Sequence, residues 1–245
     1  MLKGKKLLEI FLRSLLIQAS WNVSRMQGLG FAYSIAPLAT VTGERVQPDA
    51  SALLARHLQR FNTHPYMASP IIGSVIRLES ENRSSEVADL KNALMGPYAA
   101  IGDSFFWSSL RPFSGIAAVC IAFKGILLAP LLFLALYTPA HLWVRIRGFV
   151  TGWQQGKNGI EFIRRLDLPE KSKWTRWCST LLLGIGAYLA STAEQIHTLF
   201  QPFLLGQVGG LLVILASFLA VRKGLSSLAI LYGSVLFFAV VMMMQ

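Results

Sequence analysis

Residues 225–244 read LSSLAILYGSVLFFAVVMMM and contain no charged residue. An α-helix needs about 20 apolar residues to cross the hydrocarbon of a bilayer, and this stretch has that length. The stretch 203–221, FLLGQVGGLLVILASFLAV, is also uncharged, and the turn Arg222-Lys223-Gly224 joins the two. We expect a transmembrane hairpin with its turn in the cytoplasm, because cytoplasmic loops are rich in Lys and Arg.

The composition of the whole chain is typical of a membrane protein. Of 245 residues, 53% are apolar and 14% are charged, whereas soluble domains carry about 25% charged residues. The chain has 23 Lys and Arg against 12 Asp and Glu, a net charge of +11. In so apolar a chain this charge indicates cytoplasmic loops and anionic lipid rather than nucleic acid. The two cysteines, Cys120 and Cys178, form neither a disulfide framework nor a metal-binding pattern.

The segment 113–136 is apolar but is interrupted by Lys124-Gly125 and by Pro130. A lysine at the centre of a bilayer costs about 2.5–3.5 kcal/mol on insertion scales. Two interpretations fit, a kinked helix with a buried lysine and a re-entrant hairpin. The segment 137–177 holds eight basic and three acidic residues, so it should lie in the cytoplasm, like the basic N-terminal region. A hairpin keeps both on one side, and we therefore favour it.

These segments divide the chain into three regions. Residues 1–112 form a helical region with an amphipathic N-terminal helix and the polar clusters described below. Residues 113–177 form the re-entrant hairpin and the basic cytoplasmic segment, and residues 178–245 form the C-terminal transmembrane helices, the first of them at 178–193. Because period-two alternation is scarce, we predict an all-α membrane protein with broken or re-entrant helices and about three C-terminal transmembrane helices.

The N-terminal residues predict an amphipathic helix over 7–20. Its leucines and a phenylalanine recur three or four residues apart, and nearby lysines could meet lipid phosphates. The apolar positions are Leu8, Phe11, Leu12, Leu15 and Leu16. Two interpretations remain open, a helix lying in the membrane interface and an ordinary core helix. Glu9 and Arg13 interrupt the apolar run, so we expect no cleaved signal peptide. A further helix is predicted through 50–60, with Asp49 as its N-cap.

Three clusters place small polar or amide side chains beside aromatic residues and next to Gly or Pro. They are residues 18–27 (QASWNVSRMQ), 61–66 (FNTHPY) and 96–107 (GPYAAIGDSFFW). Amides and carboxylates bond the hydroxyls of a sugar, and an aromatic face covers the apolar side of its ring. In transporters, helices broken at Gly or Pro also free backbone groups for a ligand. The alternative is that these residues are helix caps and turns.

The histidines do not indicate catalysis. His64 could relay a proton or accept a phosphoryl group, but only Asp103 offers an acid or base nearby, so a structural or ligand-bonding role is favoured. His57, between Arg56 and Arg60, is expected to be solvated, and His141 and His197 are expected at the membrane interface. The sequence has no P-loop, nucleophile elbow, zinc-binding helix motif or dinucleotide-binding turn. A membrane enzyme using Asp103 or His64 is therefore the weakest hypothesis.

Together the three clusters resemble the enzyme IID subunits of the mannose-type sugar phosphotransferase system. The family pattern near the N-terminus is Gly/Ala-Ser-Trp-Asn-aromatic-Glu-Arg-Met-Gln, and residues 19–27 read ASWNVSRMQ. A family helix with Arg-His-Leu then leads to Phe-Asn-Thr-His-Pro, and residues 56–65 read RHLQRFNTHP. The third motif resembles residues 95–112, MGPYAAIGDSFFWSSLRP. Order and spacing agree, and the resemblance is good over residues 10–165.

The resemblance implies a non-catalytic transport subunit in the bacterial cytoplasmic membrane. With an enzyme IIC partner it would form a sugar translocation unit similar to an elevator carrier, and soluble IIA and IIB proteins would carry the phosphate to the sugar. It implies a hetero-oligomer that carries a hexose or a related sugar and needs no metal or cofactor. The residues expected at the sugar are Asn22, Ser24, Gln27, Asn62, Thr63, His64 and Asp103.

The chain departs from the family pattern at Ser24, which stands where the family has glutamate, and at Ala100, which replaces a glycine. A serine hydroxyl bonds a sugar hydroxyl more weakly than a carboxylate does, by about 1 kcal/mol per bond. Two hypotheses follow. The leading one is a IID transport subunit with an altered substrate preference. The other is a diverged paralogue that no longer transports and has a regulatory or scaffolding role.

Overall fold

A computed structural model of the chain describes residues 4–39 and 50–191, and beyond them only isolated helical positions, namely Leu212, Leu215, Ala216, Leu219, Tyr232 and Gly233. The chain forms two units, Met1–Ile185 and Gly186–Gln245. Over the part of the chain that is described, the backbone is helical and contains isolated β-bridges but no strand. The predicted all-α fold is thus confirmed. The predicted spans at 203–221 and 225–244 lie almost wholly outside the described residues.

The N-terminal helix α1 (Gly4–Ser14) is shorter than predicted, and hydrogen-bonded turns follow it to Trp21. Its inner face buries Ile10, and Ile17 in the turns is buried as well. Leu8, Leu12 and Leu16 are each more than half exposed. The expected apolar stripe therefore lies mostly outside the protein core, which favours the interfacial interpretation over the core helix.

The helix α4 (Ala68–Ser80) is the buried centre of the first unit, and it packs along the long helix α7 (Ala129–Gln155). Glycines allow this close approach. A Cβ on Gly73 would overlap the carbonyl oxygen of Phe149, and one on Gly152 would lie 2.5 Å from the carbonyl oxygen of Pro70. The two helices therefore meet backbone to backbone.

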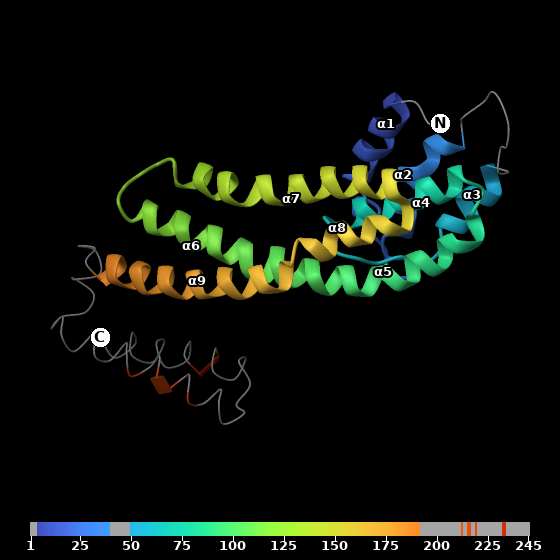
Figure 1. The fold of residues 1–245 in the computed structure, drawn as a ribbon. Helices are drawn as coiled ribbons and strands as arrows, with labels where there is room; N and C mark the ends of the chain where they lie inside the picture. The colour runs from blue at the N-terminus through green and yellow to red at the C-terminus, as the bar shows by residue number, and fades with distance from the viewer. Residues whose placement is uncertain are drawn as a thin grey trace. The chain divides into compact units, whose positions relative to one another are not determined.

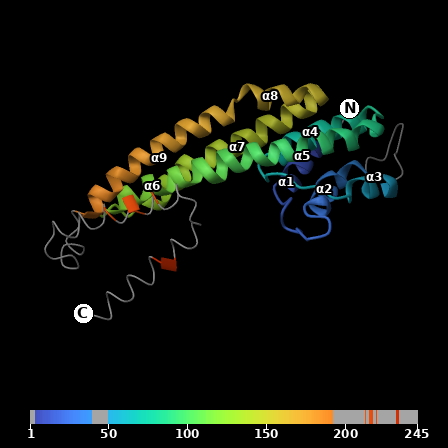
Figure 2. The same cartoon turned by 90° about the horizontal axis from the view of Figure 1, so that it is seen from below.

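One continuous helix runs from Ser84 to Ala122 and reverses into α7. It comprises the 3-10 turn η2 (Ser84–Glu86), α5 (Val87–Gly102), the π-helical segment η3 (Asp103–Leu110) and α6 (Arg111–Ala122). Figures 1 and 2 both show α6 and α7, the helices before and after this reversal, side by side. Gly125, which has a φ of 74°, lies in the connection at 123–128.

The hairpin expected around Lys124-Gly125 is thus present, but its arms extend far beyond 113–136. Each arm belongs to a helix long and apolar enough to cross a membrane, Ser84–Ala122 and Ala129–Leu189. Lys124 lies in the exposed turn rather than inside a kinked helix. That the hairpin re-enters from one side of the membrane stays a prediction.

The basic segment 137–177 is also helical. It contains the end of α7, the 3-10 turn η4 (Gly156–Gly159), α8 (Ile160–Arg165) and the start of α9 (Leu168–Ser191). The predicted span at 178–193 begins within α9. Most of its basic side chains are exposed, as a solvated segment requires, but Arg145 is buried.

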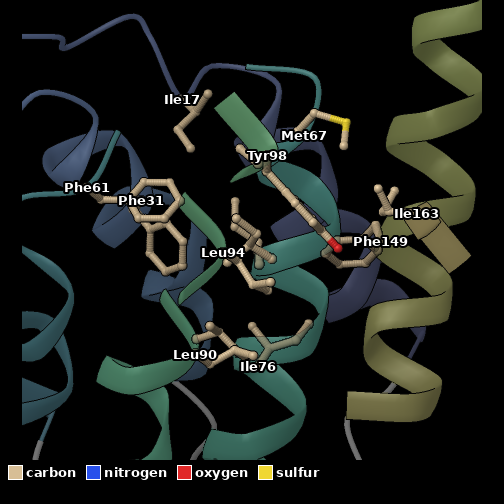
Figure 3. Close-up of a cluster of buried hydrophobic side chains, with 14 of the residues drawn as sticks. Ile17, Phe31, Phe61, Met67, Ile76, Leu90, Leu94, Tyr98, Phe149 and Ile163 are labelled. Atoms are coloured by element: carbon tan, nitrogen blue, oxygen red, sulfur yellow. The ribbon is translucent and has the colours of Figure 1, made fainter. Parts of the chain in front are cut away.

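The hydrophobic core gathers side chains from most of the elements in the first unit. Figure 3 shows Leu94 of α5 beside the ring pair of Phe31 and Phe61, Leu90 beside Ile76 of α4, and the side chain of Tyr98 extending toward Phe149 of α7. Phe31 comes from α2 (Gly28–Ile35), and α3 (Ala50–His57) adds Leu53. This core holds the segment 61–67 in place at the start of α4.

Candidate functional site

The first two polar clusters are joined by backbone hydrogen bonds. The loop from Asn22 to Met26 closes on itself, with Met26 N–H donating to the carbonyl of Asn22 (2.7 Å). Gln27 N–H then donates to the carbonyl of Phe61 (2.8 Å), and Phe61 N–H donates to the carbonyl of Arg25 (3.3 Å). Met26 has a positive φ of 52°, which lets the chain turn here. Residues 22–27 therefore lie directly beside residues 61–63.

Gln27 fastens these clusters together from inside the protein. Its buried side-chain amide donates to the carbonyl of Thr63 (2.7 Å) and accepts from the N–H of Thr63 (3.0 Å). Both ends of the amide are engaged with backbone, so Gln27 positions Thr63. The geometry gives it a holding role where the sequence suggested a sugar contact.

The second cluster meets the third at His64. The His64 ring lies against α5 so closely that a Cβ on Gly102 would overlap its Cβ and Cγ atoms. The ring stacks on Phe106, with centroids 5.3 Å apart, and tilts against Trp107 at 4.6 Å. Glycine at 102 is therefore required for the packing of His64.

His64 is a neutral, buried hydrogen-bond donor. The N–H of Tyr66 donates to its Nδ1 (3.2 Å), so the ring proton of the neutral form is on Nε2. Burial, aided by the nearby Arg145 and His141, lowers the pKa of His64 to about 3. Among the described atoms, Nε2 of His64 and Oγ1 of Thr63 are buried and have no hydrogen-bond partner. Such atoms are uncommon in proteins and indicate a place where a ligand can bond.

The other expected site residues are more accessible. Asn62 is exposed next to Thr63, and Asp103 is exposed next to Gly102. In the first cluster Ser24 Oγ donates to Oδ1 of Asn22 (2.9 Å), and the backbone N–H of Arg25 donates to the same oxygen (2.9 Å). Asn22 therefore shapes its loop, while Ser24 is exposed at its edge.

The third cluster does not break its helix at Gly96-Pro97, where an interruption was expected. The helix continues and widens into a π-helix at Asp103–Leu110. The buried Ser109 donates through Oγ to the carbonyl of Ser104 (2.7 Å), five residues earlier. The wider turn places Phe106 and Trp107 against His64. π-Helical turns are frequent at functional sites.

A further polar cluster, which was not predicted from the sequence, adjoins His64. It consists of Tyr66, Tyr137, His141 and Arg145, and we call it the Arg145 cluster. The Tyr66 and Tyr137 hydroxyls are hydrogen-bonded (3.1 Å), and His141 stacks on Tyr66 at 4.3 Å. The Arg145 guanidinium lies 4.7 Å above the Tyr66 ring. The spacing of Tyr137, His141 and Arg145 by four residues was the available signal, since it places them on one helix face.

The expectation that His57 is solvated is wrong. Its ring is fully buried, stacks on Phe31 (5.4 Å) and has Nε2 2.9 Å from Oε1 of Glu79. Arg56 donates to both oxygens of the same carboxylate at 3.2 Å. The two neighbouring residues of α3 thus both reach Glu79 on α4, which local sequence could not reveal.

No group of three or more metal-ligating side chains occurs among the described residues. The centre of the site offers neutral donors and aromatic faces, with the Asp103 carboxylate and the Arg145 cluster beside them. That arrangement can bond hydroxyl or carbonyl oxygens and cover an apolar ring face. It contains no nucleophile paired with a base within the described part of the chain.

Comparison with known proteins agrees with this reading. The sequence model of the PTS system mannose/fructose/sorbose family IID component matches residues 1–245. The PTS system mannose-specific EIID component of Escherichia coli K12 is 34% identical over 194 residues, which are 77% of this chain and 68% of that protein.

Two solved structures share the fold. One, described as a membrane protein, has a TM-score of 0.73 at 27% identity and covers 98% of this chain and 96% of its own. The other is the mannose transporter ManYZ in complex with microcin E492, with a TM-score of 0.60 at 28% identity, covering 99% of this chain and 96% of its own.

Proposed function

Since the chain belongs to the IID components of the mannose/fructose/sorbose family of the phosphotransferase system, we propose that it forms a sugar translocation unit with an enzyme IIC subunit. The sugar would enter through this unit and be phosphorylated by a IIB protein at the cytoplasmic face. The observation that carries the proposal is that all three motif clusters meet at two buried polar atoms, Thr63 Oγ1 and His64 Nε2, which have no hydrogen-bond partner among the described residues.

The proposed sugar contacts follow from the accessible and unpartnered groups. His64 Nε2 would donate to a sugar oxygen, and Thr63 Oγ1 and the Asn62 amide would donate or accept beside it. Asp103 would accept from a hydroxyl, and Ser24 would do the same from the first cluster. Trp107 is 42% exposed and can cover the apolar face of a ring. Gln27 and Asn22 would hold this arrangement rather than touch the sugar.

The proposal assigns no chemical step to this chain. The pKa of His64 lies far below neutrality, so the ring stays neutral and is packed as a donor. Its Nδ1 is engaged by backbone, and no carboxylate forms an ion pair with it among the described residues. Phosphate transfer would therefore occur on the soluble IIA and IIB proteins. We place the complex in the bacterial cytoplasmic membrane as a multi-pass assembly.

Uptake of radiolabelled hexoses tests the proposal. Cells would express the chain with and without its IIC partner, together with the IIA and IIB proteins. We expect uptake that requires both membrane chains. Asn62→Ala should abolish uptake while the IIC subunit still co-purifies, because Asn62 is exposed and lies outside the hydrophobic core.

Asn92→Ala is the matched control, since Asn92 is also an exposed asparagine but lies on the outer face of α5. It should leave uptake unchanged. Normal uptake by Asn62→Ala would refute the site. A stable complex that takes up no hexose would instead support the regulatory or scaffolding alternative, which the family match does not favour.

A further inference from the structure

Arg145 is a buried charge without a counter-charge in the part of the chain that the structure describes. It is 8% exposed, and its Nε has no hydrogen-bond partner. It lies on α7, within a helix apolar enough to cross a membrane. The contact shown for its guanidinium is with the face of Tyr66, 4.7 Å away.

The groups around Arg145 do not supply a negative charge. Tyr66 and Tyr137 bond each other through their hydroxyls (3.1 Å), and His141 lies flat on Tyr66. Nδ1 of His141 is also buried and unpartnered among the described atoms. Glu79, the one buried carboxylate among the described residues, is already bonded to Arg56 and His57. Asp103 is exposed on another helix.

A buried Arg145 without a counter-charge destabilises the chain when it is on its own. A guanidinium keeps its proton in proteins, so Arg145 cannot become neutral in the way that a buried lysine or histidine can. A cation–π contact offsets only a small part of the cost of burying a charge. Ionisable side chains in membrane segments are rare and pair with an opposite charge or line a polar pathway.

We infer that the Arg145 cluster receives a carboxylate from the IIC subunit and so forms a charged contact between the two membrane chains. This inference rests on the proposed function, because it needs a IIC partner. A neutral sugar has no charge to offer. A phosphorylated sugar would be present only during turnover and would leave Arg145 uncompensated between cycles. A permanent partner subunit compensates the charge throughout.

The surface around Arg145 is suited to such a partner. Leu142 and Ile146 lie on α7 at the flank of Arg145, three residues before it and one residue after it, and are 38% and 45% exposed. Apolar side chains that surround a buried charged group exclude water and strengthen its pairing across an interface. The planar guanidinium has donors placed to hold both oxygens of a carboxylate.

The sign of the effect of Arg145→Met on assembly tests the inference. If a partner carboxylate pairs with Arg145, the substitution leaves that carboxylate buried and unpaired. The affinity of the two membrane chains should then fall about 30-fold or more, measured as co-elution of IIC with the tagged chain over a dilution series. If Arg145 has no such partner, removing an uncompensated buried charge should leave assembly unchanged or stronger.

Two further variants keep the outcome interpretable. Arg145→Lys retains the charge and should assemble, although more weakly, whereas Arg145→Glu should fail and be restored by changing one Asp or Glu of the IIC subunit to Arg. Arg147→Met is the control, because Arg147 is exposed on the same helix two residues away. It should assemble like the wild type.

Three results would overturn the inference. One is normal assembly of Arg145→Met, including the case in which only uptake is lost, which would assign Arg145 to the substrate. Another is that no Asp or Glu to Arg substitution in the IIC subunit restores assembly of Arg145→Glu. The third is wild-type assembly that depends on added anionic lipid and loses this dependence in Arg145→Met, which would assign Arg145 to a lipid phosphate. Assembly is read separately from uptake, so a wild-type complex that forms without transporting would refute only the proposed function.

Discussion

At the scale of single residues, the difference between His57 and His64 shows how burial and partners decide what a histidine does. Both rings are buried and have lowered pKa values, and each has one buried nitrogen without a described partner. His57 is committed to a structural hydrogen bond with Glu79. His64 bonds only local backbone through Nδ1 and presents Nε2 among the aromatic rings of the third cluster. Only His64 is therefore available to a ligand.

Ser24→Glu is expected to raise uptake of mannose or glucose. Ser24 is exposed at the edge of its loop, so a longer side chain can be accommodated there. A carboxylate should improve the bond to a sugar hydroxyl by about 1 kcal/mol, or roughly fivefold in affinity. The half-saturation concentration for each labelled hexose measures this. No change for any hexose would favour a chain that no longer transports.

Acidification should loosen the contact between α3 and α4. Burial is the main cause that lowers the pKa of His57 below its ordinary 6.5, although its bond to Glu79 acts in the opposite direction. The unfolded chain therefore takes up a proton near pH 6.5 that the folded chain does not. Burial raises the pKa of Glu79, but hydrogen bonds from His57 and Arg56 outweigh it and lower the pKa overall.

The sign is the same for both groups, because each binds a proton more readily in the unfolded chain. The stability that His57 contributes should be complete above pH 6.5 and decrease below it, and that of Glu79 should decrease at lower pH, below about 4.5. The unfolding midpoint of the purified complex between pH 8 and pH 5 measures the first effect. His57→Gln, which can still donate to Glu79, should weaken this pH dependence. An equal dependence in both proteins would contradict the assignment.

At the scale of helices, the pairing of α4 with α7 depends on glycines that let backbone meet backbone. Gly148 faces Pro70, Gly152 faces Pro70 and Ser74, and Gly73 faces Phe149. In membrane proteins such small residues permit close helix packing. The same principle operates at Gly102, where the missing side chain makes room for His64.

Gly73→Ala should destabilise the protein by about 1–3 kcal/mol, because the new methyl group has no space and must push the two backbones apart. Gly96→Ala, in α5, should be neutral or slightly stabilising, since nothing lies within 4 Å of its Cβ position and alanine favours a helix. Thermal unfolding of the two purified variants compares them. Equal midpoints would show that α4 and α7 are not in this contact.

At the scale of the whole molecule, the hairpin between Ala122 and Ala129 relates the N-terminal region to the basic segment. If both arms of the hairpin begin and end on one side of the membrane, the two regions lie on that side. This holds whether the arms cross the whole bilayer or only part of it. From the distribution of Lys and Arg we predict that this side is the cytoplasm.

Cysteine labelling should confirm this arrangement. Lys5 and Lys171 are exposed, and in a Cys178→Ser background the other native cysteine, Cys120, is buried. Lys5→Cys and Lys171→Cys should each react with a membrane-impermeant maleimide only after the cells are permeabilised. Labelling of Lys171→Cys alone in intact cells would require an odd number of crossings between them.

The sequence by itself determined the membrane class, the helical fold and the family resemblance. Each depends on local information, namely the length of apolar runs, the absence of period-two alternation and contiguous motifs such as residues 61–66 and 96–107. It also pointed to a hairpin near Lys124, because a charge and two helix-breaking residues interrupt an apolar run. These features can be recognised in the sequence because bilayer thickness and backbone hydrogen bonding constrain every membrane-spanning chain in the same way.

The tertiary structure decided which polar residues are available. Gln27, a sugar candidate in the sequence, has both ends of its amide bonded to Thr63, 36 residues away. His57 is paired with Glu79, and Arg145 is buried beside Tyr66 with no described carboxylate. Whether a polar group finds a hydrogen-bond partner depends on atoms that are distant in the chain. Hydropathy and residue spacing do not reveal those partners. That Thr63 Oγ1 and His64 Nε2 are buried without a partner in the described part of the chain could therefore be recognised only in three dimensions.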